Sequence, residues 1–457
     1  MIAVGHIEPA AGILLPLVCG FAIMLHKIRT RFGPRMRLAA VRPALHPPRL
    51  RRDQRGNVAV VVAAVFPLLI GSAGLAVDGV QWILQKREIQ AAADSAAMAG
   101  VYSLIASDDM QNAVSRSIGN SGNVPGNASI QALQGPPGHE ADPFAVAVRI
   151  AAPARMYFAS MFMKSTPVIS AEATASVVKN GQYCAFALGT MHDQAGVVIR
   201  PNSDVEADCG VTINSSSKQA LESEGGSTFK SPILRAFGGF KEIAAFKQSG
   251  MREHALLQDD PLDGTDPPQI PNTGCPNATV NGGEDEIALD PGCYGFMMLN
   301  GNVRLRDGEY ILNQGNFIVG PRAHVVCNAC TIFLTSETAA TDSGSIGKVK
   351  ISSSATIKMS AMREGPNAGI LFYQDRHAGR DLAGDENRLG GNSFSKLDGL
   401  IYFPSETVYV DANNAPDVTC TRFVAKRLVF AGRVYIGKSC DGLDKVTFAA
   451  TEVRLIA

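Results

Sequence analysis

The sequence Asn57-Val-Ala-Val-Val-Val-Ala-Ala-Val-Phe-Pro-Leu-Leu-Ile-Gly-Ser-Ala-Gly-Leu-Ala-Val77 decides how this chain is organised. From Val58 to Val77 it contains no charged residue, and about 20 apolar residues are what an α-helix needs to cross a bilayer. Pro67 interrupts the run, which a membrane helix tolerates better than a soluble one. A buried core helix is the alternative, but the length of the run and its flanking charges favour a membrane anchor.

The two flanks of the run differ in charge. Four arginines precede it (Arg49, Arg51, Arg52 and Arg55), whereas Asp78 follows it. Because basic residues stay on the cytoplasmic side of a spanning helix, we expect a cytoplasmic N-terminal flank, with everything after Asp78 outside. Trp82, the only Trp of the chain, stands where an interfacial aromatic anchor is expected. The predicted anchor residues are Val58, Phe66, Pro67, Val77 and Trp82.

Three blocks around the run resemble a known family. They are Arg51-Arg-Asp-Gln-Arg-Gly-Asn-Val-Ala-Val60, Gly74-Leu-Ala-Val-Asp78 and Gln90-Ala-Ala-Ala-Asp-Ser-Ala-Ala-Met-Ala99. In this order they resemble the N-terminal module of TadG-like proteins (TadE/TadG-like), which belong to the tight-adherence (Flp/Tad) pilus assembly system of bacteria. The resemblance implies a component of a pilus-assembly apparatus in the cell envelope, with other assembly or pilin-like proteins as partners.

The residues from Gly79 to Ile105 predict that the helix continues past the membrane. This stretch is rich in Ala, which has the best helix propensity and lets another helix approach closely. Its apolar face is expected to pack either on partner helices, as in pilins, or on the chain's own domain. Prepilin processing would want a Glu five residues beyond Gly56, but that position is Val61. Cleavage there, and the role of major filament subunit, are therefore not expected.

The N-terminal residues carry a second apolar run, Ala10 to Leu25, which is shorter than a usual span. Three interpretations stay open: a short first span, a reverse-oriented interfacial segment, or a translation start called too early. Between Lys27 and Arg55 lie ten Lys and Arg residues and one acid, Asp53. Such a segment fits a cytoplasmic loop beside anionic lipid better than a nucleic-acid site. The whole chain balances at 42 basic and 42 acidic residues, which also argues against a polyanionic partner.

Beyond the helix the pattern predicts a small α+β segment. Residues 108–142 are rich in Ser, Asn, Gly and Pro and are expected to form loops. Strands are expected at 144–150 and 167–178, with a short helix at 153–162 between them. The chain thus divides into a short apolar run with a basic segment (1–55), the anchor and extended helix (56–105), the α+β segment (106–180) and an exported β-rich domain (181–457).

From Tyr183 short β-rich pieces alternate with Gly, Asn, Asp and Ser. Strands this short cannot each bury an apolar face, whereas stacking them as rungs of a parallel β-helix buries one continuous core. We therefore expect a parallel β-helix-like domain, with a β-sandwich as the alternative because no strict repeat period is present. Residues 253–274 are acidic and Pro-rich and predict a long loop over the surface.

Eight of the nine cysteines follow Tyr183, and the ninth is Cys19. An even number in a segment outside the cytoplasm indicates disulfides in an oxidising compartment. Eight cysteines allow 105 connectivities. Proximity along the chain favours Cys184–Cys209, Cys275–Cys293, Cys327–Cys330 and Cys420–Cys440. A redox or zinc role for the single CxxC, Cys327-Asn-Ala-Cys330, is disfavoured because the chain has no second CxxC.

The most reactive-looking cluster is Gln374-Asp-Arg-His377, followed by Arg380, Asp381, Asp385 and Glu386. Paired carboxylates on a β-helix would suggest a polysaccharide hydrolase or lyase, but a solvated loop whose charges pair locally is the favoured interpretation. Asp342-Ser-Gly-Ser345 falls short of the DxSxS metal motif, so no metal and no cofactor are expected. GxSxG and HExxH motifs are absent from the sequence.

Together these features predict a non-enzymatic envelope protein. One helix anchors it in the bacterial inner membrane, and the bulk of the chain is a periplasmic, disulfide-braced β-rich domain for binding or scaffolding, with envelope polysaccharide among its potential ligands. The first alternative is a membrane-tethered β-helix carbohydrate-active enzyme, which would require Asp375 and His377. The second is a surface adhesin acting in cell adhesion.

Overall fold

The computed structural model describes residues 57–240, 250–272, 274–283, 285–379, 384–411, 420–437 and 449–456 of the chain. By its internal contacts the chain divides into units of residues 1–74 and 75–457. The apolar run from Ala10 to Leu25, the basic segment before Asn57 and Cys19 lie outside the described residues.

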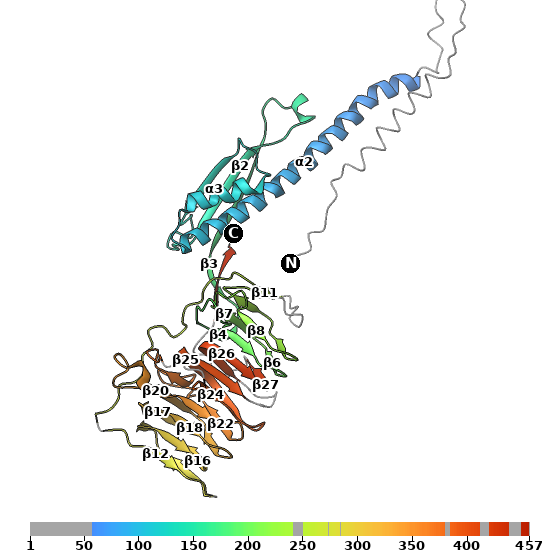
Figure 1. The fold of residues 1–457 in the computed structure, drawn as a ribbon. Helices are drawn as coiled ribbons and strands as arrows, with labels where there is room; N and C mark the ends of the chain where they lie inside the picture. Colours follow the sequence, from blue (N-terminus) through green and yellow to red (C-terminus); the bar gives the residue numbers. More distant parts are fainter. Residues whose placement is uncertain are drawn as a thin grey trace, which may run out of the picture. The chain divides into compact units, whose positions relative to one another are not determined.

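One helix, α2 (Asn57–Ile105), contains both the apolar run and the Ala-rich stretch that follows it (Figure 1). Pro67 lies inside it. Proline removes one backbone donor from the helix ladder, yet α2 continues through it to Ile105. The expectation that the membrane-type run continues directly into an Ala-rich helix is confirmed.

A four-stranded antiparallel sheet accompanies the second half of α2. Its strands are β1 (Ser129–Gln134), β2 (Val146–Pro153), β3 (Val168–Asn180) and β28 (Ala450–Leu455), in the order β1-β2-β3-β28. Helix α3 (Met110–Ser121) shares a buried apolar cluster with α2 and this sheet. Alternate residues of β2, among them Val146, Val148 and Ile150, are fully buried in that cluster. The sheet and the two helices form the α+β module.

Two local expectations about this module were wrong. Residues 108–142 are not all loop, because they contain α3 and β1. Asp109 caps α3 by accepting a hydrogen bond from the Asn112 backbone N–H, and Gly122 ends it at φ 66°. Residues 153–162 do not form a regular helix; they contain only the 3-10 turn Ala159–Met161.

The last strand, β28, belongs to the small sheet although the β-rich domain precedes it in the chain. Six of its residues pair with β3, from Ala450 opposite Asn180 to Leu455 opposite Ala175. The chain therefore leaves the sheet after β3, builds the β-rich domain and returns to complete the same sheet. Residues 183–436 are in this sense inserted between two neighbouring strands of the α+β module.

The β-rich domain is a parallel β-helix, as predicted. Its early strands are β4 (Tyr183–Ala187), β5 (Val197–Ile199), β6 (Asp204–Ala207), β7 (Gly210–Ile213), β8 (Leu221–Ser223), β9 (Thr228–Lys230), β10 (Leu234–Ala236) and β11 (Met251–Arg252). Its later strands are β12 (Ala278–Val280), β13 (Ile287–Leu289), β14 (Gly292–Tyr294), β15 (Met297–Leu299), β16 (Asn302–Leu305), β17 (Gly308–Asn313), β18 (Phe317–Val319), β19 (His324–Cys327), β20 (Cys330–Thr335), β21 (Val349–Ile351), β22 (Thr356–Ser360), β23 (Ile370–Gln374), β24 (Asn387–Leu389), β25 (Lys396–Asp411), β26 (Thr421–Ala431) and β27 (Arg433–Ile436). From β12 to β24 each strand pairs in parallel with the third strand after it, or with β25.

Side chains of the same kind stack from coil to coil. Val303 of β16 lies opposite Val325 of β19, which lies opposite Ile357 of β22, and all three are fully buried. Coil length is not constant, since Met297 pairs with Phe317 but Phe317 pairs with Val349. This variation explains why no strict period marks the sequence.

The order of coils along the β-helix differs from their order in the chain. Strand β26 pairs with β25 on one side and with β4 and β5 on the other. The coils built first and the coils built last therefore meet in the middle of the stack, while β12 begins the coil at one end (Figure 1). Closing this junction brings together residues far apart in sequence, which makes folding slow.

The acidic connection after β11 lies across one face of the β-helix. Leu262 is buried there in an apolar cluster with Tyr373 and Tyr402. The Tyr402 hydroxyl donates to Asp260 at 2.5 Å, and the Tyr373 hydroxyl donates to the carbonyl oxygen of Thr265 at 2.5 Å. The two tyrosine rings stack with centroids 4.9 Å apart.

We expect this tyrosine cluster to make the fold sensitive to strong alkali. Burial raises the pKa of Tyr373 to about 12, and burial together with the hydrogen bond to Asp260 raises the pKa of Tyr402. A raised folded-state pKa stabilises the fold fully below the unfolded value of about 10, and this stabilisation is lost as pH rises towards 12. Absorbance of tyrosinate near 295 nm should therefore show these two groups ionising only with unfolding. Tyr402→Phe, which removes one titrating group, should move the alkaline transition upward.

Candidate functional site

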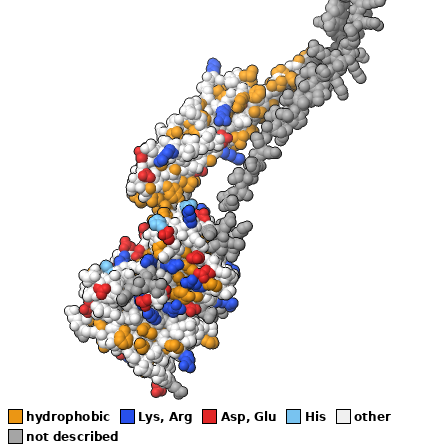
Figure 2. Space-filling model, viewed as in Figure 1, with side chains coloured by type: hydrophobic (Ala, Val, Ile, Leu, Met, Phe, Trp, Pro, Cys, Tyr) orange, Lys and Arg blue, Asp and Glu red, His pale blue; other side chains and the backbone are white. Residues whose placement is uncertain are grey.

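The first half of α2 exposes large apolar side chains on all sides. Between Val58 and Val77 the exposed ones are Val58, Val60, Val61, Val62, Val65, Phe66, Leu68, Leu69, Ile70, Leu75 and Val77, with exposed fractions from 43% to 72%. Figure 2 shows such hydrophobic side chains, in orange, on the surface of the helix. A helix that is apolar all round and unburied has the character of a membrane span. It is the single helix of the described residues that is long and apolar enough to be one.

Asp78, the first charged residue after the run, is completely buried. Its carboxylate accepts hydrogen bonds from three consecutive backbone N–H groups, those of Tyr157 at 3.1 Å, Phe158 at 2.8 Å and Ala159 at 2.5 Å. A buried carboxylate needs such donors to replace its lost hydration. Asp78 therefore fixes the connection between β2 and β3 to the helix at the end of the apolar run.

The next polar residues of α2 extend this junction. The indole N–H of Trp82 donates to the Arg155 carbonyl oxygen at 2.8 Å. Gln85, which is buried, donates to the Pro153 carbonyl oxygen at 2.9 Å and accepts from the Arg155 backbone N–H at 3.0 Å. The Lys86 ammonium donates to the Ser170 carbonyl oxygen. The junction thus uses polar side chains of α2 and backbone groups at the ends of β2 and β3.

The Ala-rich face of α2 packs on the chain's own sheet, which is the second of the two predicted alternatives. Ala93, Ala96 and Ala97 are fully buried in the cluster with β2 and β3. A Cβ added at Gly100 would lie 2.9 Å from Cγ1 of Val146, so Gly permits this close packing. Tyr102, by contrast, lies on a face of α2 that stays exposed.

The structure contains disulfides Cys184–Cys209, Cys275–Cys293 and Cys327–Cys330, which are the sequence neighbours that the prediction paired. Cys420 is also disulfide-bonded, and Cys440, its predicted partner, lies outside the described residues. The first bridge joins β4 to the residue before β7, in the neighbouring coil. These disulfides covalently link coils and turns of the β-helix.

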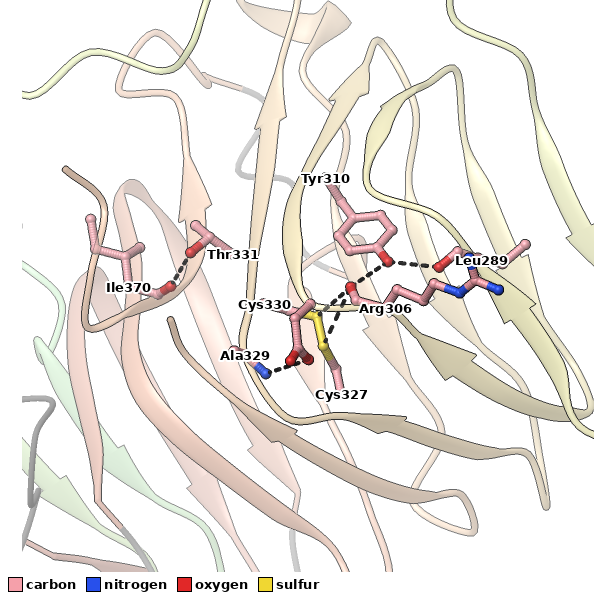
Figure 3. The surroundings of a disulfide bond; sticks show 9 residues. Leu289, Arg306, Tyr310, Cys327, Ala329, Cys330, Thr331 and Ile370 are labelled. Carbon is pink, nitrogen blue, oxygen red and sulfur yellow. Dashed lines mark hydrogen bonds between the residues drawn. A yellow bond between two sulfur atoms is a disulfide. The ribbon is translucent and has the colours of Figure 1, made fainter. Parts of the chain in front are cut away.

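Figure 3 shows how the Cys327–Cys330 bridge is enclosed. Its two sulfur atoms lie 4.0 and 3.7 Å from the carbonyl oxygen of Arg306, in the preceding coil. The Tyr310 hydroxyl donates to that same carbonyl oxygen at 2.7 Å, and both cysteines are buried. A buried disulfide at a tight turn between two strands is a structural element, in contrast to the partly exposed thiols of redox centres.

The cluster Gln374–His377 lies at the end of β23. Asp375 is buried, and its carboxylate accepts from the Thr335 hydroxyl at 2.8 Å and contacts Nδ1 of His377 at 2.8 Å. Arg376 pairs with Asp263 at 2.9 Å on the acidic connection. An Asp–His pair can orient an imidazole for base catalysis, but no hydroxyl or thiol of the described residues hydrogen-bonds the His377 ring. The charges of this loop pair with their surroundings.

Other predicted positions carry structural contacts. Asp342 caps the 3-10 turn Ser343–Ser345 by accepting from the Gly344 backbone N–H. Asp385 pairs with Lys350 at 2.7 Å, while Arg380 and Asp381 lie outside the described residues. Within the described part of the chain, no three His, Cys, Asp or Glu side chains are grouped as a metal site would require.

The Asp78 junction could not be found from sequence motifs, because the donors to the Asp78 carboxylate are backbone N–H groups 79 to 81 positions away. Its one sequence signal was Asp78 itself, a charge directly after an uncharged run.

Comparison with known proteins finds a match to one family model and no match to an individual protein. No curated protein and no solved structure matches the chain significantly. Residues 56–108 match the family model described as putative Flp pilus-assembly TadE/G-like, which covers α2 from the start of the apolar run to its end at Ile105. This confirms the resemblance carried by the three N-terminal blocks. Residues 56–108, which include the candidate membrane span and Asp78, are thus similar to the TadE/G-like family of Flp pilus assembly.

Proposed function

We propose that this chain is an inner-membrane-anchored, non-enzymatic component of Flp pilus assembly, with its β-helix on the periplasmic side as a binding or scaffolding domain. The observation that carries the proposal is the coincidence of the TadE/G-like match at 56–108 with a helix whose first half is apolar and exposed. The charge asymmetry around that helix supports the orientation. The disulfides support an oxidising compartment.

The non-enzymatic role is supported by the surroundings of Asp375. Its carboxylate oxygens contact Thr335 and His377, and the neighbouring Arg376 pairs with the acidic connection. With these contacts the Asp375 carboxylate stabilises the loop after β23. The partners proposed for the chain are other proteins of the assembly system, recognised through exposed faces of α2, in addition to the membrane.

A topology measurement tests the orientation. Alkaline phosphatase fused after Ala457 should be active in intact bacteria, because this enzyme requires an oxidising compartment. Green fluorescent protein fused at the same position should be dark when exported through the general secretory route. An inactive phosphatase with a bright fluorescent fusion, and free thiols in the β-helix, would contradict the proposal.

Loss of the chain should abolish Flp pili on the host cell, and the wild-type chain should restore them. A variant with Asp375→Asn and His377→Ala should restore pili equally well if the role is not enzymatic. Cell-surface glycan composition, measured in the same strains, separates the enzyme alternative: a change that follows these two substitutions would favour it. Cleavage of the β-helix by protease added to intact cells would favour the adhesin.

A further inference from the structure

The connection between β2 and β3, residues 154–167, exposes an unusual group of large apolar side chains. We call it the interface loop. Its exposed side chains are Tyr157 (61%), Phe158 (40%), Met161 (78%), Phe162 (65%) and Met163 (39%). Clustered exposure of aromatic and Met side chains on one short segment marks a binding surface. The only regular element in the loop is the 3-10 turn Ala159–Met161.

Contacts along α2 place the interface loop at the end of the sheet nearest the apolar run. Gln90 donates to the Glu172 carbonyl oxygen at 3.0 Å, and Gln85 contacts Pro153. Asp78, about two helical turns earlier, holds residues 157–159. Strand β2 therefore runs towards the apolar run, the loop turns there, and β3 runs back. Val77, the last residue of the uncharged run, is adjacent to Asp78 in sequence.

The loop also carries the charge and side-chain types of a membrane interface. Arg155 and Lys164 are exposed, and the chain has no Asp or Glu between Asp142 and Glu172. Basic residues close to a bilayer surface are attracted to anionic headgroups. Tyr and Trp favour the headgroup level, and Trp82 contacts the backbone of Arg155 in this same junction.

We propose that the interface loop inserts its apolar side chains into the headgroup region of the bilayer that α2 spans, with Arg155 and Lys164 on anionic lipid. The inference rests on the proposed anchoring by α2. A single spanning helix can tilt and rotate, whereas a second contact fixed to it through Asp78 holds the α+β module in one orientation on the membrane. The rotation of α2 then decides which helix faces are available to partners within the bilayer.

The test uses the full chain with Cys19→Ser, reconstituted in vesicles of phosphatidylcholine and phosphatidylglycerol. An environment-sensitive fluorophore is attached to one introduced cysteine, at Met161→Cys in the loop. Leu133→Cys in β1 is the matched control, because Leu133 is also an exposed apolar residue of this module (53%). Phe66→Cys reports whether α2 is in the membrane. Quenching is measured with lipids that carry the nitroxide near the headgroup for positions 161 and 133, and with lipids that carry it deep in the acyl chain for position 66.

Quenching at position 161 is expected to be about threefold stronger than at position 133, and Arg155→Glu with Lys164→Glu should reduce it towards the control. If position 66 is quenched but positions 161 and 133 are alike, the inference is overturned while the anchor stands. If position 66 is not quenched by lipids carrying the nitroxide deep in the acyl chain, the anchoring itself fails. Shielding of position 161 only when other assembly proteins are added would identify a protein-docking loop and overturn the lipid contact.

Discussion

Replacing Glu452 by Gln should destabilise the chain by about 3–5 kcal/mol, because it leaves a buried guanidinium without its counter-charge. Glu452 of β28 pairs with Arg235 of β10, and their side chains are 11% and 7% exposed. The Arg235 guanidinium also lies 5.8 Å from the centre of the Tyr183 ring, in a cation–π contact. Urea unfolding of the full chain in detergent, followed by circular dichroism, measures the loss.

Two variants show whether the loss comes from the unpaired charge. Arg454→Gln removes the other arginine that contacts Glu452, but the Arg454 side chain is 52% exposed, so the loss should stay below about 1 kcal/mol. Arg235→Met combined with Glu452→Leu removes both charges and should recover most of the stability. A small effect of Glu452→Gln, equal to that of Arg454→Gln, would show that water reaches the Arg235 guanidinium.

The elements that could be predicted from the sequence are those whose signal is local. The uncharged run before Asp78 and the Ala-rich stretch after it predict one continuous helix, and short strands between turn residues predict stacked coils. Helix α3 was missed although Val114 and Ile118 have helical spacing, because Ser, Asn and Gly surround them. The helix expected at 153–162 does not form, because the backbone N–H groups of 157–159, which a helix would direct to the carbonyl groups of 153–155, donate to Asp78 instead.

The remaining features depend on partners distant in the sequence. Nothing in the residues of β28 identifies β3 as their partner, since any edge strand offers the same backbone groups. The pairing of β26 with β4 and β5 likewise follows from the path of the whole chain. The Asp78 junction is equally hard to predict, because its hydrogen-bond donors are distant in the sequence and are backbone groups of a loop without a sequence motif. These long-range contacts determine where the interface loop and the last strand lie.

Removing the Cys184–Cys209 bridge should destabilise the β-helix more than removing Cys327–Cys330. The two cysteines of the first pair are 25 positions apart, and those of the second are 3 apart. In the chain-entropy account, a bridge restricts the unfolded chain more when it closes a longer loop. The double substitution Cys184→Ala with Cys209→Ala should therefore lose about 3–4 kcal/mol, and Cys327→Ala with Cys330→Ala about 2 kcal/mol.

This pair of variants is a matched comparison, because all four sulfur atoms belong to buried residues and Ala leaves a similar small void in each case. A larger loss for the longer loop would mean that the bridge acts by restricting the unfolded chain, and urea midpoints of the two variants measure it. Equal losses would instead mean that native contacts of the sulfur atoms dominate. In that case the Cys327–Cys330 bridge, enclosed beside the Arg306 carbonyl oxygen, would contribute as much as the bridge between coils.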